Sequence, residues 1–238
     1  MLGLPLVNLV YRHLAATGRL EGVWRELRPN LTDPAIETSA AELLTAAELP
    51  LAPFSRAALA AAGVSDDELA GTVATLDAYN HANPRNLVAI RALLEPARRT
   101  GRKVLLGGHA RPLVLQAPLL PMADLEAVDA PVLALLEEMA QPFAGRGEQV
   151  LIPGLFRHFA GNPAFLALLW TALRPQVEGR GLARRANVIA RRAGELAAAL
   201  PSPVQPVAEP ETRAALTRFA FTLPRMIVVG GALRRALR

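Results

Sequence analysis

The stretch YRHLA at residues 11–15 has a near copy, FRHFA, at residues 156–160, about 145 positions further along the chain. Each copy is followed by a tryptophan and then by Leu-Arg-Pro: WRELRP begins at Trp24, and WTALRP begins at Trp170. Two separated matches in the same order and at nearly the same spacing indicate that the chain contains two copies of one unit.

A second match extends this repeat toward the end of each copy. LDAYNHANPRNLVAIRALL begins at Leu76 and aligns with LTRFAFTLPRMIVVGGALR, which begins at Leu216. The offset is 140 residues, so the Pro-Arg pair at 84–85 falls on the Pro-Arg pair at 224–225.

The composition predicts that both copies are helical. Apolar residues make up 52% of the chain and aromatic residues only 5%, so the core is built mainly from Leu, Ala and Val. Runs such as VLALLEEMAQ carry apolar residues at three- and four-residue spacing, and no sustained period-two alternation occurs. We therefore predict an all-α fold. We expect Pro29 and Pro175 to end the helices that carry the tryptophans, and Asn83 and Pro84 to begin another helix.

The repeat divides the chain into three parts. We expect the first helical copy at 1–103, a linker at 104–150 with a helix near 131–139, and the second copy at 151–238. Two copies are too few for a solenoid, so we predict that they pack face to face about a pseudo-twofold axis, as an intramolecular pseudo-dimer. Such an interface offers a natural site for an asymmetric cavity.

Charge and cysteine content narrow the class of protein. The chain has no cysteine and a formal net charge of +5, with the positive excess in the second half. Charges or prolines interrupt every apolar run before it reaches membrane-spanning length. We expect a cytoplasmic protein that does not insert into membranes. The arginines lie beside an apolar stripe without interleaved aromatics, so nucleic-acid binding is not expected.

No cofactor signature is present. The four histidines lack metal-ligand spacing, and neither a dinucleotide fingerprint, a phosphate-binding loop nor a nucleophile elbow occurs. We expect neither a metal nor an organic cofactor.

The doubled (Y/F)RxxA…W…LRP unit, the Asn-Pro pair at 83–84 and the linker LPMADLEAVDAP resemble the group I 2-haloacid dehalogenases. The resemblance implies an all-helical pseudo-dimer whose unit is similar to that of alkylhydroperoxidase-D-like proteins. It further implies direct attack of water on a small halogenated carboxylic acid, without a cofactor. An Asp near IPGLFRHFA should activate that water. This chain has no Asp after Asp129, and Gly154, Leu155 and Phe156 occupy the region.

One polar cluster is present in the first copy alone. Asp77, Asn80 and His81 share a helix face by their spacing and align with Thr217, Ala220 and Phe221. We predict Asp77 as the base that activates water, Asn80 and His81 as hydrogen-bond donors to the substrate, and Tyr79 as a residue lining the pocket. The alternative is that this face is simply solvated.

The Arg-His pairs are present in both copies. Arg12 with His13, and Arg157 with His158, are predicted to meet near the pseudo-axis and bind a substrate carboxylate, with Tyr11 beside them. The alternative is structural: the arginines cap helix C-termini or pair with glutamates, and the histidines bond to backbone carbonyls.

Three hypotheses on function therefore remain open. The first is a hydrolase of small substituted carboxylic acids, and the second is a non-catalytic protein that binds such an acid or has a structural role. The third is a binder of nucleic acid or of anionic surfaces through the Arg-rich second half. Beyond the small acid no partner is predicted, and a homodimer is left open.

Overall fold

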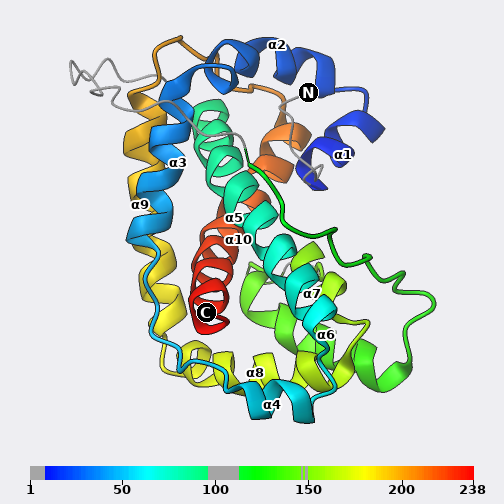
Figure 1. The fold of residues 1–238 in the computed structure, drawn as a ribbon. Coiled ribbons are helices and arrows are strands. Elements are labelled where there is room, and N and C mark those ends of the chain that lie inside the picture. The colour runs from blue at the N-terminus through cyan, green and yellow to red at the C-terminus, as the bar shows by residue number, and fades with distance from the viewer. Residues whose placement is uncertain (1–8, 96–112, 146, 148–149) are drawn as a thin grey trace.

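The computed structural model describes residues 9–95, 113–145, 147 and 150–238, and within these ranges it is all-α, without a strand (Figure 1). Its elements are α1 Leu9–Ala16, α2 Leu20–Leu31, α3 Pro34–Ala46, α4 Arg56–Ala61, α5 Asp66–Leu94, α6 Ala130–Ala140, the short 3₁₀ helix η1 Gln141–Phe143, α7 Gly154–Phe159, α8 Pro163–Glu178, α9 Gly181–Ala198 and α10 Pro210–Ala236. The helix expected in the linker is thus α6. The predicted boundary between residues 103 and 104 lies outside the described residues.

The two longest helices, α5 and α10, pack against each other at the centre of the molecule (Figure 1). Residues 82–90 of α5 and 226–233 of α10 are all buried. A helix that is buried all round must be enclosed by other elements. Here α3 and α9, which lie side by side, both pack against this pair.

The matched sequence blocks lie on helices that follow one another in the same order. The first phrase falls on α1 and α2 and its copy on α7 and α8, while residues 76–94 fall on α5 and their counterparts on α10. Between them stand α3 and the short α4 in one half and α9 in the other. A pseudo-twofold relation between the halves stays a prediction.

The expectation that Pro29 and Pro175 end their helices is wrong. The helix α2 continues to Leu31 and α8 continues to Glu178, with each proline inside the last turn. A proline near the end of a helix removes one backbone hydrogen bond, and here the helix ends within three residues of it.

The expectation that Asn83 and Pro84 begin a helix is also wrong. The helix α5 runs unbroken through Pro84, and α10 runs through Pro224. In each case the arginine after the proline donates from Nη1 to the carbonyl four residues before it: Arg85 to His81, and Arg225 to Phe221 at 2.8 Å. Each proline removes the bond to the carbonyl four residues before it, so this arginine bond, to the next carbonyl along, is an additional contact and not a replacement.

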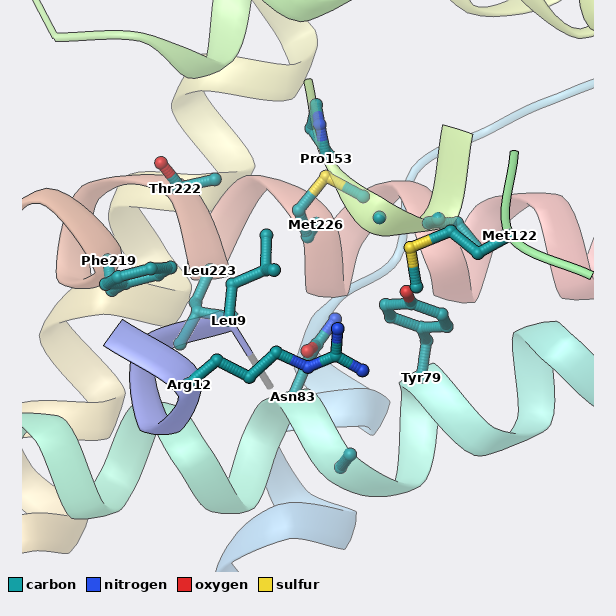
Figure 2. Close-up of a pocket in the computed structure, with 13 residues that line it drawn as sticks. Leu9, Arg12, Tyr79, Asn83, Met122, Pro153, Phe219, Thr222, Leu223 and Met226 are labelled. Carbon is teal, nitrogen blue, oxygen red and sulfur yellow. The ribbon is translucent and has the colours of Figure 1, made fainter. Parts of the chain in front are cut away.

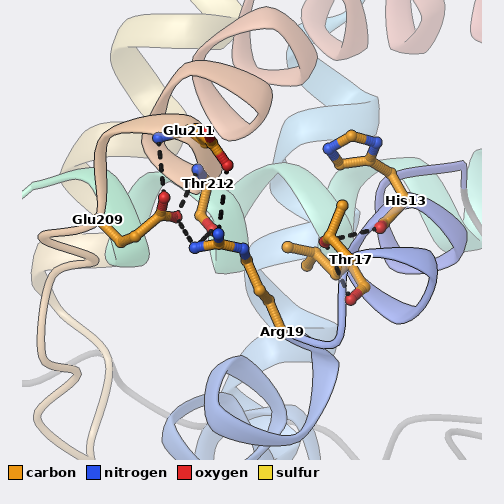
Figure 3. Close-up of polar contacts among 7 residues, drawn as sticks. His13, Thr17, Arg19, Glu209, Glu211 and Thr212 are labelled. Atoms are coloured by element: carbon orange, nitrogen blue, oxygen red, sulfur yellow. Dashed lines mark hydrogen bonds and ion pairs between the residues drawn. The ribbon is translucent and has the colours of Figure 1, made fainter.

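The start of α10 is held by a charged cluster (Figure 3). The carboxylate of Glu209 accepts from the backbone N–H of Thr212 at 2.7 Å, which caps the helix. The guanidinium of Arg19, between α1 and α2, forms ion pairs with Glu209 and Glu211. The first helices of the chain are thereby tied to the last one.

The length and composition of α10 would also suit a membrane-spanning helix. Within its most apolar window, however, 67% of the residues are buried inside the protein. The apolar surface of α10 is therefore used mainly in the core.

A largely buried ion pair joins α3 to α5. The Nε of Arg85 donates to Glu37 at 2.6 Å, and the side chains are 7% and 26% exposed. Because a buried guanidinium without a counter-charge is costly, the pair fixes how α3 lies on α5.

We expect Glu37→Ala to lower the free energy of unfolding by about 3 kcal/mol, because it leaves Arg85 buried without its carboxylate. Chemical denaturation would measure the change. Glu21→Ala, which removes the exposed partner of Arg25, is the matched control and should have little effect. Equal effects of the two substitutions would contradict this prediction.

Candidate functional site

A cavity of about 80 Å³ lies between α1, α5, α10 and the start of α7 (Figure 2). It is large enough for a few water molecules or a small organic acid. The described lining residues are mostly apolar: Leu9, Arg12, Tyr79, Ala82, Asn83, Met122, Pro153, Gly154, Leu155, Phe219, Thr222, Leu223 and Met226.

The cavity is built from residues that correspond in the two sequence copies. Its wall contains three pairs related by the 140-residue offset: Tyr79 with Phe219, Ala82 with Thr222, and Asn83 with Leu223. From the sequence we predicted that Tyr79 lines the pocket. We assigned Asn83 to the start of a helix and did not predict the lining residues of α10. The signal that could have found them is the alignment itself, because corresponding positions on crossing helices meet where the helices cross.

Arg12 alone carries a charge among the described residues that line the cavity. Its side chain extends from α1 over Asn83 toward Tyr79 (Figure 2). Arg12 is itself exposed, so solvent reaches this side of the cavity. No Asp or Glu of the described ranges lines the wall. The site therefore offers a cation and apolar surface but no carboxylate base.

Gly154 lies in the IPGLFRHFA segment, near which the resemblance places the catalytic Asp, and it lines the cavity. A Cβ at this position would be 2.5 Å from the hydroxyl oxygen of Tyr79, well inside van der Waals contact. The Tyr79 ring thus occupies the space that a side chain at 154 would need. A carboxylate side chain at position 154 and the Tyr79 hydroxyl in its present position could not both fit.

His158 packs behind Tyr79, with ring centroids 5.7 Å apart in an edge-to-face arrangement. Its Nδ1 lies 2.6 Å from the carbonyl oxygen of Leu120, so Nδ1 carries the proton and Nε2 has the free lone pair. This Nε2 is buried and has no hydrogen-bond partner in the described structure. Burial lowers the pKa of His158 below its ordinary 6.5, which keeps the ring neutral.

Burial also raises the pKa of the Tyr79 hydroxyl to about 12, against the opposing effect of the Arg12 and Arg157 charges. At neutral pH this hydroxyl is therefore protonated. It can donate a hydrogen bond into the cavity, but it does not act as a base there.

Asp77, the predicted base, lies outside the cavity wall. Its carboxylate accepts from Nε of Arg234 at 2.7 Å, and nearby Asn80 donates to the carbonyl of Gly230 at 3.2 Å. Both side chains join α5 to α10. This face is an interface between helices, contrary to the alternative that it is solvated, and the catalytic role of Asp77 stays a prediction.

The remaining candidates are dispersed. His81 is half-buried and His13 is exposed, and neither lines the cavity. Tyr11 has a buried hydroxyl without a partner in the described structure. Arg157 donates from Nε and Nη2 to the carbonyl of Ala123, at 3.1 and 2.7 Å. His158 bonds to a backbone carbonyl, as in the structural alternative, whereas Arg157 bonds to Ala123, which lies outside any helix. Arg12 alone of these residues lines the cavity.

The described residues contain no group of three or more His, Asp and Glu side chains placed to hold a metal ion.

We predict that Gly154→Ala lowers the free energy of unfolding by about 1–3 kcal/mol, because the new methyl group overlaps the Tyr79 hydroxyl. In a Tyr79→Phe background the same substitution should cost less, since the overlapping oxygen is gone and the next ring atom lies at 3.6 Å. Denaturant titration of the four proteins gives this double-mutant cycle. An unchanged cost in the Phe background would refute the overlap.

The stability should fall as the pH drops below about 6.5, because the unfolded chain takes up a proton at His158 before the folded one does. Burial lowers the pKa of His81 as well, so we expect His158→Asn to reduce the fall without removing it. Denaturation at pH 7.5, 6.5 and 5.5 would measure it. His13→Asn, at an exposed position, should retain the full fall, and the same retention in His158→Asn would exclude the role of His158.

No protein-family model matches this chain, and no curated protein does. Among similar solved structures, a D-2-haloacid dehalogenase complex with L-LA matches with a TM-score of 0.82, and a mutant of such an enzyme matches with 0.80. Both are 17% identical and cover 100% of this chain and 88% of theirs. A mutant complex with D-2-CPA matches with 0.74, at 17% identity, over 98% and 87%. The chain therefore has the all-helical fold of the D-2-haloacid dehalogenases, as its sequence resemblance implies.

Proposed function

We propose that this protein binds a small carboxylic acid in the cavity between α1, α5, α7 and α10. The observation that carries the proposal is a cavity of about 80 Å³ with apolar walls and the single guanidinium of Arg12. A planar guanidinium pairs with a carboxylate through two parallel hydrogen bonds, and the apolar walls suit a short carbon chain. The Tyr79 hydroxyl is placed to donate a further hydrogen bond.

Binding without hydrolysis is the form of this function that the geometry supports best. Hydrolysis by direct water attack requires a base beside the reacting carbon. The described lining contains no carboxylate, and the ring of Tyr79 fills the space beside Gly154. A ligand held by Arg12 would then lie in a cavity without an evident group to activate water.

Hydrolysis of a 2-halo acid is the second candidate. The unpartnered Nε2 of His158 is the observation in its favour, because a neutral imidazole nitrogen can take a proton from water, but His158 lies behind Tyr79 and does not line the cavity. In this reaction the water oxygen forms the new C–O bond, the halide leaves with the electrons of the C–X bond, and the base takes the proton. Asp77 remains the alternative base, although it is paired with Arg234.

We also propose that the two halves form a pseudo-dimer. The repeated helix order and the corresponding pairs in the cavity wall support this arrangement. A cytoplasmic location, a possible self-association into homodimers and the lack of a nucleic-acid partner stay predictions.

Isothermal titration with racemic 2-chloropropionate should show binding, and Arg12→Met should weaken it by at least about tenfold, because the charge-assisted hydrogen bonds are lost. Arg25→Met is the matched control: Arg25 is an exposed arginine of α2 outside the cavity and should bind like the wild type. Absence of binding, or equal affinity in the Arg12 variant, would refute the proposal.

Halide release separates the two candidate functions. We expect purified protein to release no more halide from 2-chloropropionate than a heat-inactivated control. Sustained release would establish the hydrolase instead, and the loss of turnover in either His158→Asn or Asp77→Asn would then identify the base.

A further inference from the structure

A groove of about 390 Å³ lies on the other side of the α5–α10 crossing, with α9 along one wall. Of the described residues, none lines both this groove and the cavity. Three arginines line the groove, Arg91, Arg213 and Arg225, and Glu95 is the one acid that the structure describes there.

Arg225 corresponds to Arg85 in both sequence and contact. Each follows a proline inside its helix, and each donates from Nη1 to the carbonyl four residues earlier. Arg85 additionally has a carboxylate partner, Glu37 of α3. In the described structure Arg225 has no such partner.

The alignment of α3 with α9 explains this difference. Four identical residues match at an offset of 153 positions: Ile36 with Ile189, Ala40 with Ala193, Glu42 with Glu195, and Leu43 with Leu196. Three of these pairs are buried on both helices, so the match is structural as well. At the same offset Glu37 corresponds to Ala190, which lines the groove. The carboxylate is replaced by a methyl group.

A second ion pair is missing in the same place. Asp77 and Arg234 pair across α5 and α10 in one half. Their counterparts at the 140-residue offset are Thr217 and Leu94, and both line the groove. In one half, ion pairs close this side of the crossing. In the other half the corresponding acids are missing, so the groove is open and the charge of Arg225 has no counter-charge in the described structure.

The charge that remains is positive and faces an apolar surface. Arg91 pairs with Glu95, but its buried Nε has no hydrogen-bond partner in the described chain. The guanidinium of Arg225 stacks over the ring of Phe221, 3.7 Å from the centroid. Phe221 is 37% exposed, so its ring is accessible to a ligand from solvent. Burial lowers the pKa of Arg225, as expected for a guanidinium without a counter-charge.

We propose that this groove binds a small organic oxyanion. Its carboxylate or phosphate group takes the place of the missing Glu37 counterpart between Arg225 and Arg91, and its apolar part packs on Phe221. The ligand thus supplies the negative charge that the chain supplies itself in its first half.

Isothermal titration at constant ionic strength, with benzoate and separately with inorganic phosphate, tests the site. Ala190→Glu restores a carboxylate beside Arg225 and should weaken binding of the effective probe by at least about tenfold. Ala164→Glu adds the same charge at an exposed position of α8 and should bind like the wild type. Tighter binding of benzoate identifies an organic carboxylate as the ligand class, and tighter binding of phosphate identifies a phosphate group.

The proposal fails if the wild type binds neither probe up to about 10 mM, or if Ala190→Glu binds as tightly as the wild type. Arg91→Gln is the second variant and should also weaken binding, even if Ala190→Glu does not fold. Binding of 2-chloropropionate through Arg12 should be unchanged in both variants. The Ala190 and Arg91 variants therefore report on the groove, and the Arg12 variant reports on the cavity.

Discussion

The crossing of α5 and α10 is the constraint on which the rest of the structure depends. Each helix is buried around its middle and contains a proline there, which removes a backbone hydrogen bond in the core. In both helices the following arginine donates to a nearby carbonyl. A helix in the core thus acquires a guanidinium, and burying that charge is costly without a counter-charge. The two halves differ in whether the chain supplies that counter-charge.

The first half closes its side of the crossing with ion pairs. Glu37 neutralises Arg85, and Asp77 neutralises Arg234. The second half lacks the corresponding acids and has an open groove instead. An interaction that stabilises one half therefore corresponds to a candidate binding site in the other. This accounts for an acid pattern that the sequence alone suggested was catalytic: Asp77 is found in an ion pair between helices.

In the cavity, the packing of Tyr79 beside Gly154 decides which chemical groups line the wall. With no side chain at Gly154, the hydroxyl of Tyr79 occupies the wall where a catalytic carboxylate was expected. Tyr79 is held in turn by the ring of His158, whose Nδ1 bonds to the Leu120 carbonyl. The whole fold resembles that of D-2-haloacid dehalogenases, while the chemical groups of its cavity favour binding an anion through Arg12. Overall packing tolerates such changes because it depends on the buried helices and not on the cavity's polar groups.

The sequence by itself determined the all-α fold, the existence of two matched blocks and the absence of the expected Asp. Periodicity, repetition and composition are found along the chain without knowledge of which residues meet in space. It also identified Arg12 and Tyr79 as candidate site residues, and both line the cavity. Only the tertiary structure decided that α5 and α10 continue through Pro84 and Pro224, since burial of both helices in the core offsets the cost of the prolines. It likewise decided which polar residues meet. Asp77 pairs with a residue 157 positions away, and a contact of that range depends on how helices cross, which no spacing along one helix reveals.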